Sequence, residues 1–201
     1  ELGEYFFRLD MNYGSSARSS CLEILQDYWR VGSTEEVLKS LEEIRKQGHR
    51  TKFNVLKATL PPEGSIDQKS LDKFSQVFSF DFTDKEVALK REELQSLAEW
   101  IQSTGKYLKE GGILAWDMAR AVQLIKLSFV AGYLSDDQAW AELLKLAPLV
   151  EGPFADWMDF SQSFLVGRTF WSGVSDPQIK AVCERLLGHP ASPWLYIPWR
   201  E

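Results

Sequence analysis

The stretch from Ile113 to Gly132 is apolar on nearly every side of a helix, and it constrains the fold more than any other part of the chain. Its apolar residues surround a helix axis and do not follow a single stripe, which is typical of a helix buried in the middle of a domain. We therefore expect helix 113–132 to be the central buried helix. The residues that surround its axis are Leu114, Trp116, Met118, Val122, Ile125, Phe129 and Val130.

Helix starts recur along the chain in one pattern, a small polar residue followed three positions later by Glu or Gln. In this pattern the two side chains satisfy backbone amides that the first turn of a helix leaves free. Gly48 and Gly111 are predicted helix stops. The predicted starts are Ser33 to Glu36, Thr83 to Glu86 and Ser135 to Gln138, together with Ser175-Asp176-Pro177, where proline occupies the first turn.

These signals predict an all-α fold, a compact multi-helix single domain over residues 1–201. Within it we distinguish an N-terminal helical region (1–32), amphipathic helices (33–110) and a core with a tail (111–201). Strand alternation is scarce. The predicted helices lie near 17–30, 34–47, 67–79, 84–109, 113–132, 136–147, 156–171 and 177–187.

The C-terminal segment Ser192–Trp199 is rich in tryptophan and proline. Its prolines forbid a central strand, so we expect an extended tail that lies across the domain surface. Trp194, Ile197 and Trp199 are expected to hold this tail in place.

Composition and charge narrow the class of protein. The 201 residues are 44% hydrophobic and 26% charged, which is typical of a globular chain, and no apolar run approaches the roughly 18 residues that a membrane span requires. A net charge of -6 argues against nucleic acid as a partner and favours a basic protein. Eight Trp and twelve Phe favour a well-ordered core or an interface with aromatic anchors.

The cysteines and histidines give no support for a metal site or a cofactor. Cys21 and Cys183 are far apart in the sequence, without a CxxC motif or a histidine cluster, and we expect both to be reduced core residues of a cytoplasmic protein. The chain begins at Glu1, and no retained segment resembles a signal peptide. The oligomeric state has no signature in the sequence.

Three charged residues occupy apolar helix faces and define the candidate site. At about 100 degrees per residue, Asp117 falls on the same face as Ala121 and Leu124, and Arg120 is one turn away. Arg168 interrupts an aromatic stripe of the helix near 156–171. Because a buried ion needs a partner, we expect Asp117 and Arg168 to lie near each other, bridged with Arg120.

This cluster has two interpretations. A buried Arg–Asp pair often fixes which helices meet, without contact to any ligand. Alternatively, the same groups line a pocket for a small anion or for a partner's side chain. The predicted walls of such a pocket are Trp116, Trp140 and Trp171.

Catalytic constellations are scarce, since nucleophilic triads and most metal sites need more His or Cys than this chain has. His49 follows the predicted stop Gly48 directly, where an imidazole commonly serves the last helix carbonyls. We therefore expect His49 to be a structural cap. The alternative is a catalytic histidine.

An ordered set of short motifs from about Ser33 to Trp199 resembles the bacterial domain-of-unknown-function family numbered 1266. The resemblance implies a compact helical bacterial protein of the cytoplasm with no catalytic residues to inherit. The motifs that carry it are Gly48-His49-Arg50, Ala115-Trp116-Asp117 with Arg120, Ala131-Gly132-Tyr133, Ala139-Trp140, Trp157 with Phe160, Gly167-Arg168 with Phe170-Trp171, and Ser192-Pro193-Trp194 with Pro198-Trp199.

Two hypotheses for the function follow from the sequence. The first is a noncatalytic protein-interaction module, such as an immunity-type protein or an adaptor, which binds a protein partner through an acidic surface and an aromatic tail. The second is an enzyme or a small-anion-binding module that uses Arg120 and Arg168 beside Asp117. The sequence favours the first.

Overall fold

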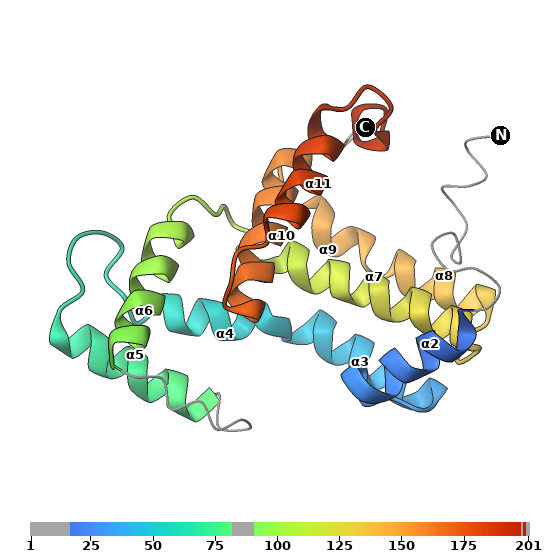
Figure 1. The fold of residues 1–201 in the computed structure, drawn as a ribbon, viewed down its shortest axis with the longest axis horizontal. Helices are drawn as coiled ribbons and strands as arrows, with labels where there is room; N and C mark the ends of the chain where they lie inside the picture. Colours follow the sequence, from blue (N-terminus) through green and yellow to red (C-terminus); the bar gives the residue numbers. More distant parts are fainter. Residues whose placement is uncertain (1–16, 82–90, 198, 200–201) are drawn as a thin grey trace. The chain divides into compact units, whose positions relative to one another are not determined.

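The computed structural model describes residues 17–81, 91–197 and 199, and within these residues the chain is helical with no β-strand (Figure 1). The predicted all-α class is therefore confirmed. The predicted helix start at Thr83–Glu86 lies outside the described residues.

The described residues divide into two compact units. Unit 1 contains the residues up to Gln47 and Asp117–Gly152, and unit 2 contains Gly48–Trp116 and the residues from Pro153 onward. The single domain over residues 1–201 stays a prediction. The helices of unit 1 are α2 (Arg18–Ile24), a π-helical turn η1 (Leu25–Trp29), α3 (Thr34–Lys46), most of α7 (Leu114–Ala131), α8 (Asp136–Leu144) and α9 (Ala147–Glu151). Those of unit 2 are α4 (Gly48–Lys57), α5 (Gln68–Asp81), α6 (Arg91–Gly105), the first turn of α7, α10 (Trp157–Ser172), α11 (Pro177–Gly188) and the 3-10 turn η2 (Pro193–Leu195).

Two of the predicted helix starts in unit 1 have the expected capping geometry. Ser33 accepts a hydrogen bond from the Glu36 amide at 3.3 Å. Ser135 forms a complete capping box, in which its hydroxyl accepts from the Gln138 amide at 3.2 Å and its own amide donates to the Gln138 side chain at 2.9 Å. Each cap satisfies backbone amides that the helix leaves free, which explains why the sequence located these starts.

Unit 2 contains one helix that the sequence patterns did not predict. Gly48 has a φ of +52°, the left-handed conformation of a helix stop, so its predicted role is confirmed. The chain then enters α4 at once, and α4 buries Phe53 and Leu56 on one face. The spacing of three between these two residues is helical. However, a helix of ten residues shows too few repeats of this spacing to be recognised in the sequence directly after the stop signal at Gly48.

The predicted helices 84–109 and 136–147 end earlier than expected. Helix α6 ends at Gly105, so the prediction of Gly111 as its stop was wrong. Gly111 is instead buried, and a Cβ atom there would lie 2.5 Å from the Phe154 ring. Helix α8 ends at Leu144, and a separate short helix α9 contains Pro148 in its first turn. Proline lacks an amide hydrogen and cannot continue a helix from the preceding turn.

Helix α7 is buried over most of its surface, as its composition predicts. Asp117, Ala121, Leu124 and Ser128 are all fully buried, in agreement with the predicted face. Among the predicted core positions, Val122 is 36% exposed, and Phe129 and Val130 are half-buried.

The apolar core of unit 2 lies between α4, α5 and α6. Helix α4 packs against α5, α6 and α10, and α10 packs against α11 (Figure 1). Phe53 and Phe74 are fully buried in this core, and the Phe53 ring meets Phe170 of α10 edge-on at 5.3 Å. These contacts fix the position of α10 relative to α4, and α10 carries two of the candidate site residues, Arg168 and Trp171.

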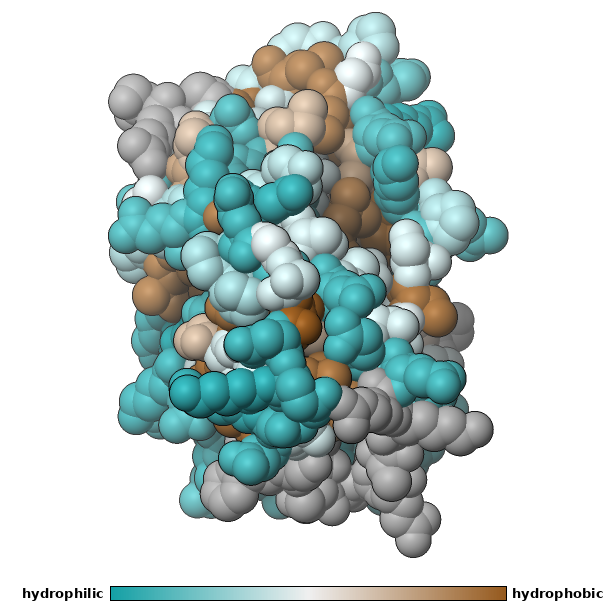
Figure 2. All heavy atoms as spheres, turned by 90° about the vertical axis from the view of Figure 1, so that its left-hand side faces the viewer, coloured by the Kyte–Doolittle hydropathy of each residue, from teal (hydrophilic) through white to brown (hydrophobic). Residues whose placement is uncertain are grey.

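The surface that carries α5 and α6 is mostly hydrophilic, with apolar side chains in separate small areas (Figure 2). This is the pattern of amphipathic helices whose apolar faces point inward. Among the described residues, no helix combines the length and the apolar character that a membrane crossing needs.

Candidate functional site

The predicted polar cluster is divided between the two units. Asp117, Arg120 and Trp140 belong to unit 1, whereas Trp116, Arg168, Trp171 and His49 belong to unit 2. The expected proximity of Asp117 and Arg168 therefore stays a prediction, and each part of the cluster is described by itself.

In unit 1, Arg120 lies in a buried aromatic environment. Its guanidinium carbon lies 4.9 Å from the centre of the Trp29 ring, within the range of a cation–π contact. Burial lowers the pKa of Arg120, whereas interactions with Tyr28 and Asp117 raise it. Arg120 and Asp117 thus interact electrostatically within unit 1, and the predicted cluster that includes Arg168 stays a prediction. The sequence did not indicate Tyr28 or Trp29, because both come from the π-helical turn η1.

Some buried polar atoms of unit 1 form no hydrogen bond with any described residue. Among them are the indole Nε1 of Trp29 and the hydroxyl Oγ of Ser128. Such groups are uncommon in protein interiors, because an unsatisfied buried donor costs free energy. The interior of unit 1 is therefore polar in places where apolar residues would be more stable.

Two ion pairs among the described residues of unit 1 share a buried carboxylate that the sequence did not identify. Glu142 of α8 is 4% exposed, and its carboxylate accepts hydrogen bonds from Arg45 and Lys145, each at 2.5 Å. Burial by itself raises the pKa of Glu142, but the hydrogen bonds from Lys145 and Arg45 outweigh this effect and lower it. Trp140, on the same helix, is half-buried, and its role as a pocket wall stays a prediction.

In unit 2, Trp116 connects the start of α7 to α10. Trp116 is 7% exposed, and its ring lies 5.7 Å from that of Phe164 and 5.5 Å from that of Trp171. Gly167 of α10 is buried directly against it, because a Cβ atom at this position would lie 2.9 Å from the Trp116 Cγ atom. The Gly167-Arg168 motif therefore includes a glycine that permits close helix packing.

His49 accepts a hydrogen bond from Trp116. The indole Nε1–H donates to Nδ1 of His49 at 3.0 Å, and the two rings are inclined by only 15°. A ring nitrogen that accepts a hydrogen bond carries no proton, so this contact selects the neutral imidazole with its hydrogen on Nε2. His49 lies in the first turn of α4, and its predicted capping role is not tested by this contact.

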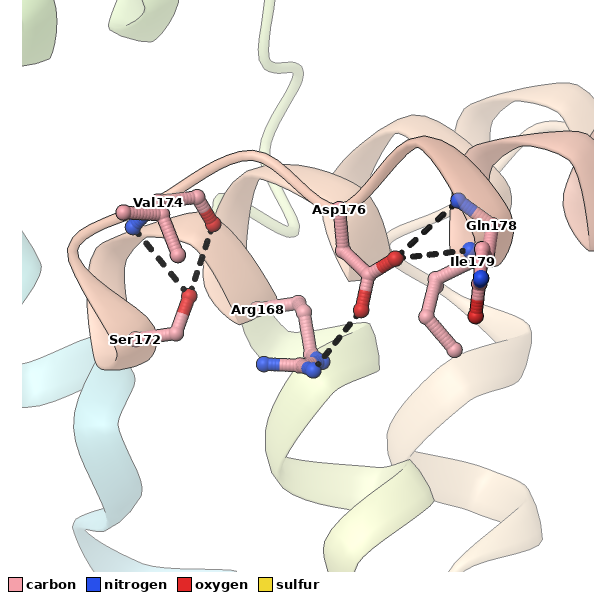
Figure 3. Close-up of polar contacts among 6 residues, drawn as sticks. All are labelled: Arg168, Ser172, Val174, Asp176, Gln178 and Ile179. Atoms are coloured by element: carbon pink, nitrogen blue, oxygen red, sulfur yellow. Dashed lines mark hydrogen bonds and ion pairs between the residues drawn. The ribbon is translucent and has the colours of Figure 1, made fainter.

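Arg168 pairs with an acid of unit 2 that sequence analysis treated only as a helix start. Its Nη2 donates to Oδ2 of Asp176 at 3.1 Å, and its guanidinium carbon lies 5.4 Å from the centre of the Trp171 ring. The other carboxylate oxygen of Asp176 accepts from the amides of Gln178 and Ile179 at 3.0 and 3.2 Å (Figure 3). A single carboxylate thus caps α11 and fixes the guanidinium of α10.

The C-terminal tail is held against the start of α10 by its tryptophans, as the sequence predicts. The rings of Trp157 and Trp194 are stacked with centroids 4.7 Å apart and an angle of 11°. Trp157 Nε1 donates to the Ile197 carbonyl at 2.9 Å, and Trp199 Nε1 donates to the Phe154 carbonyl at 2.8 Å. The tail contains one 3-10 turn, Pro193–Leu195, capped by Ser192.

Both cysteines are free and buried, Cys21 in unit 1 and Cys183 in unit 2. Burial raises the pKa of each thiol, and for Cys183 a hydrogen bond with Ser161 opposes the rise. A high pKa keeps a thiol in its unreactive protonated form. Within the described ranges, no group of three or more His, Cys, Asp or Glu residues is arranged to hold a metal ion.

Fold and site together define an all-α protein with polar residues buried among aromatic rings. The chain belongs to the family described as protein of unknown function DUF1266, whose profile matches residues 24–199. It is also similar to the uncharacterized protein YbeR of Escherichia coli (strain K12), with 24% identity over 100 residues. That match covers 50% of this chain and 43% of YbeR, so it spans less than half of the relative's length. No solved structure matches the chain.

Proposed function

We propose that this protein is a noncatalytic interaction module of the bacterial cytoplasm, of the immunity or adaptor type, that binds a basic protein. The contact surface in this proposal is the tail surface, defined as Leu195, Tyr196 and Ile197. The observation that carries the proposal is that these side chains are exposed while the backbone beneath them is fixed.

The exposure of the tail surface is large for apolar residues. Leu195, Tyr196 and Ile197 are 52%, 74% and 52% exposed, respectively. Exposed aliphatic and aromatic side chains that are adjacent to one another are typical of protein-binding surfaces. Tyrosine in particular is enriched among the residues that contribute most to binding energy.

The backbone of the tail surface is held by its neighbours. The Tyr196 hydroxyl donates to the Pro190 carbonyl at 2.6 Å, and the Ile197 carbonyl accepts the hydrogen bond from Trp157. The Ser192 hydroxyl donates to the Leu186 carbonyl of α11. Side chains that are already ordered lose less conformational entropy on binding, which favours affinity.

The charge of the chain supports a basic partner. Asp and Glu number 29 against 23 Lys and Arg. An acidic protein attracts a basic one at long range and accelerates the encounter, and salt screens this attraction. The proposed partner therefore combines a basic surface with an apolar pocket for the tail surface.

The experiment compares the wild-type protein with Tyr196→Ala as baits in a bacterial lysate, followed by a binding measurement with the purified partner. Tyr107→Ala is the matched control, because Tyr107 is 70% exposed and lies outside the tail. We expect Tyr196→Ala to weaken binding at least tenfold, Tyr107→Ala to have no effect, and the wild-type affinity to fall as the salt concentration rises.

Equal binding by Tyr196→Ala and the wild-type protein would refute the role of the tail surface. Affinity that is independent of salt would refute a basic partner. Tyr196→Ala also removes the hydrogen bond to the Pro190 carbonyl. Because Tyr196 is mostly exposed, we expect the rest of the fold to stay intact, and a thermal unfolding curve of each variant checks this.

A further inference from the structure

A hollow of about 510 Å³ in unit 1 lies beside the end of the π-helical turn η1. Its size is within the range of sites for small molecules, about 300–1,000 Å³. The residues that line it are Gln26, Arg30, Val31, Gly32 and Tyr133. None of them belongs to the tail surface or to the cluster predicted from the sequence.

The polar side chains of the hollow are available to a ligand. Within the part of the chain that the structure describes, those of Gln26, Arg30 and Tyr133 form no hydrogen bond or ion pair. The neighbouring acid is already engaged, because the Glu36 carboxylate accepts a hydrogen bond from the Gly32 amide at 2.7 Å. The hollow thus combines a guanidinium, an amide and a phenol around an open volume.

The backbone of Arg30 is in a conformation that favours glycine. Its φ is +57°, and among the described residues it is the one non-glycine residue with a positive φ. Arg30 ends the π-helical turn, where the Val31 amide donates to the Leu25 carbonyl at 3.1 Å. Glycine adopts this conformation without the steric cost that a Cβ atom incurs. An arginine in this conformation lowers the stability of the protein relative to glycine, which indicates a functional role for the Arg30 side chain.

A second rare feature lies at the same place. π-helical turns are uncommon and occur frequently at functional sites, because the extra residue changes the direction of the side chains that follow. Here the turn ends directly before Arg30 and contains Gln26, so it determines the direction of two of the three polar side chains of the hollow.

We propose that this hollow binds a small anionic molecule whose carboxylate or phosphate group is held by the guanidinium of Arg30. A guanidinium presents a planar pair of donors that matches both groups. The amide of Gln26 and the phenol of Tyr133 donate or accept further hydrogen bonds from the rest of the molecule.

The test uses three probes, inorganic phosphate, phenyl phosphate and benzoate, each titrated at constant ionic strength against sodium chloride. Binding is followed by the change in melting temperature and by backbone amide NMR shifts. We expect at least one probe to give saturable shifts at the amides of Gln26, Arg30 and Tyr133. The probe that binds more tightly distinguishes phosphate from carboxylate recognition.

The decisive variant is Arg30→Gly. Because glycine suits a positive φ, this variant is expected to melt at a higher temperature than the wild-type protein and to bind the probe at least tenfold more weakly. A loss of binding then cannot result from unfolding. Lys39→Ala is the matched control, since it removes an exposed positive charge of α3 in the same unit and is expected to bind normally.

Two results would overturn this inference. One is the absence of saturable shifts in the wild-type protein with all three probes at millimolar concentration. The other is equal binding by Arg30→Gly and the wild-type protein.

Discussion

Replacing Gly167 by alanine should destabilise the protein, although the same change usually stabilises a helix. In an exposed helix interior, Gly→Ala is favourable by about 1 kcal/mol. At Gly167, a Cβ atom would lie 2.9 Å from the Cγ atom of Trp116 and 3.2 Å from the Cβ atom of Ile113, and still closer to the Cβ atom of Trp116. The Cβ atoms of Trp116 and Ile113 are bonded to the backbone and cannot rotate away.

The expected magnitude follows from these opposing effects. Overpacking a buried site costs about 1–3 kcal/mol, and the close approach to backbone-attached atoms places Gly167 in the upper part of that range. After the gain in helix propensity, we expect a net loss of about 1–2 kcal/mol. For a protein of this size, that loss lowers the melting temperature by about 2–8 °C.

The assay is thermal and urea unfolding of Gly167→Ala, followed by circular dichroism and tryptophan fluorescence. Gly188→Ala is the matched control, because Gly188 is the last residue of α11 and, apart from its own helix backbone and chain neighbours, no atom of the described residues lies within 4 Å of an added Cβ atom. We expect the control to be neutral or slightly stabilising. A Gly167→Ala variant as stable as the wild-type protein would refute the close packing of α10 on Trp116.

Three further predictions concern single polar groups. Asp176→Ala should cost about 1–2 kcal/mol and Asp176→Asn less than about 1 kcal/mol. Asparagine retains the helix cap and loses only the partly buried ion pair with Arg168. Equal losses in urea unfolding would show that the cap contributes nothing. Glu142→Gln should cost about 1–3 kcal/mol at neutral pH. The pKa of Glu142 is lowered in the folded state. The stability advantage of the wild-type protein over Glu142→Gln is therefore fully present above the unfolded pKa of about 4.3, and it is lost as the pH falls through the folded pKa. A stability difference in urea unfolding that does not change with pH would contradict this. Ser128→Ala should stabilise the protein by about 0.5–1.5 kcal/mol, because it removes a buried hydroxyl that has no hydrogen-bond partner among the described residues and because alanine has the higher helix propensity. A variant that is less stable than the wild-type protein in thermal unfolding would show that the hydroxyl does form a hydrogen bond.

Local signals in the sequence were sufficient for most of the helix boundaries. The capping box at Ser135 and the cap at Asp176 were both located from residue type and spacing, and both are present. A cap joins groups that are two or three residues apart, so no knowledge of the tertiary structure is needed to find it. The same reasoning missed α4, whose ten residues follow a glycine that does end the preceding helix.

The burial of Asp117 was also predictable, but the acid that pairs with Arg168 and the ring that lies against Arg120 were not. Helical periodicity placed Asp117 on an apolar face, and it is fully buried. The partner of Arg168 in unit 2 is Asp176, eight residues later, because the chain turns back between α10 and α11. The guanidinium of Arg120 lies over Trp29, which is 91 positions earlier in the chain.

The sequence by itself determined where most of the described helices start, that Asp117 lies on a buried face and that the tail carries its own aromatic anchors. These properties depend on spacings of a few residues, and the geometry of a helix fixes them. Only the tertiary structure decided which acid pairs with Arg168, which glycine permits close packing on Trp116, and that Arg30 adopts a left-handed conformation beside an open hollow. These properties depend on residues that are distant in the chain or on backbone angles that non-glycine residues rarely adopt, and no spacing rule encodes them.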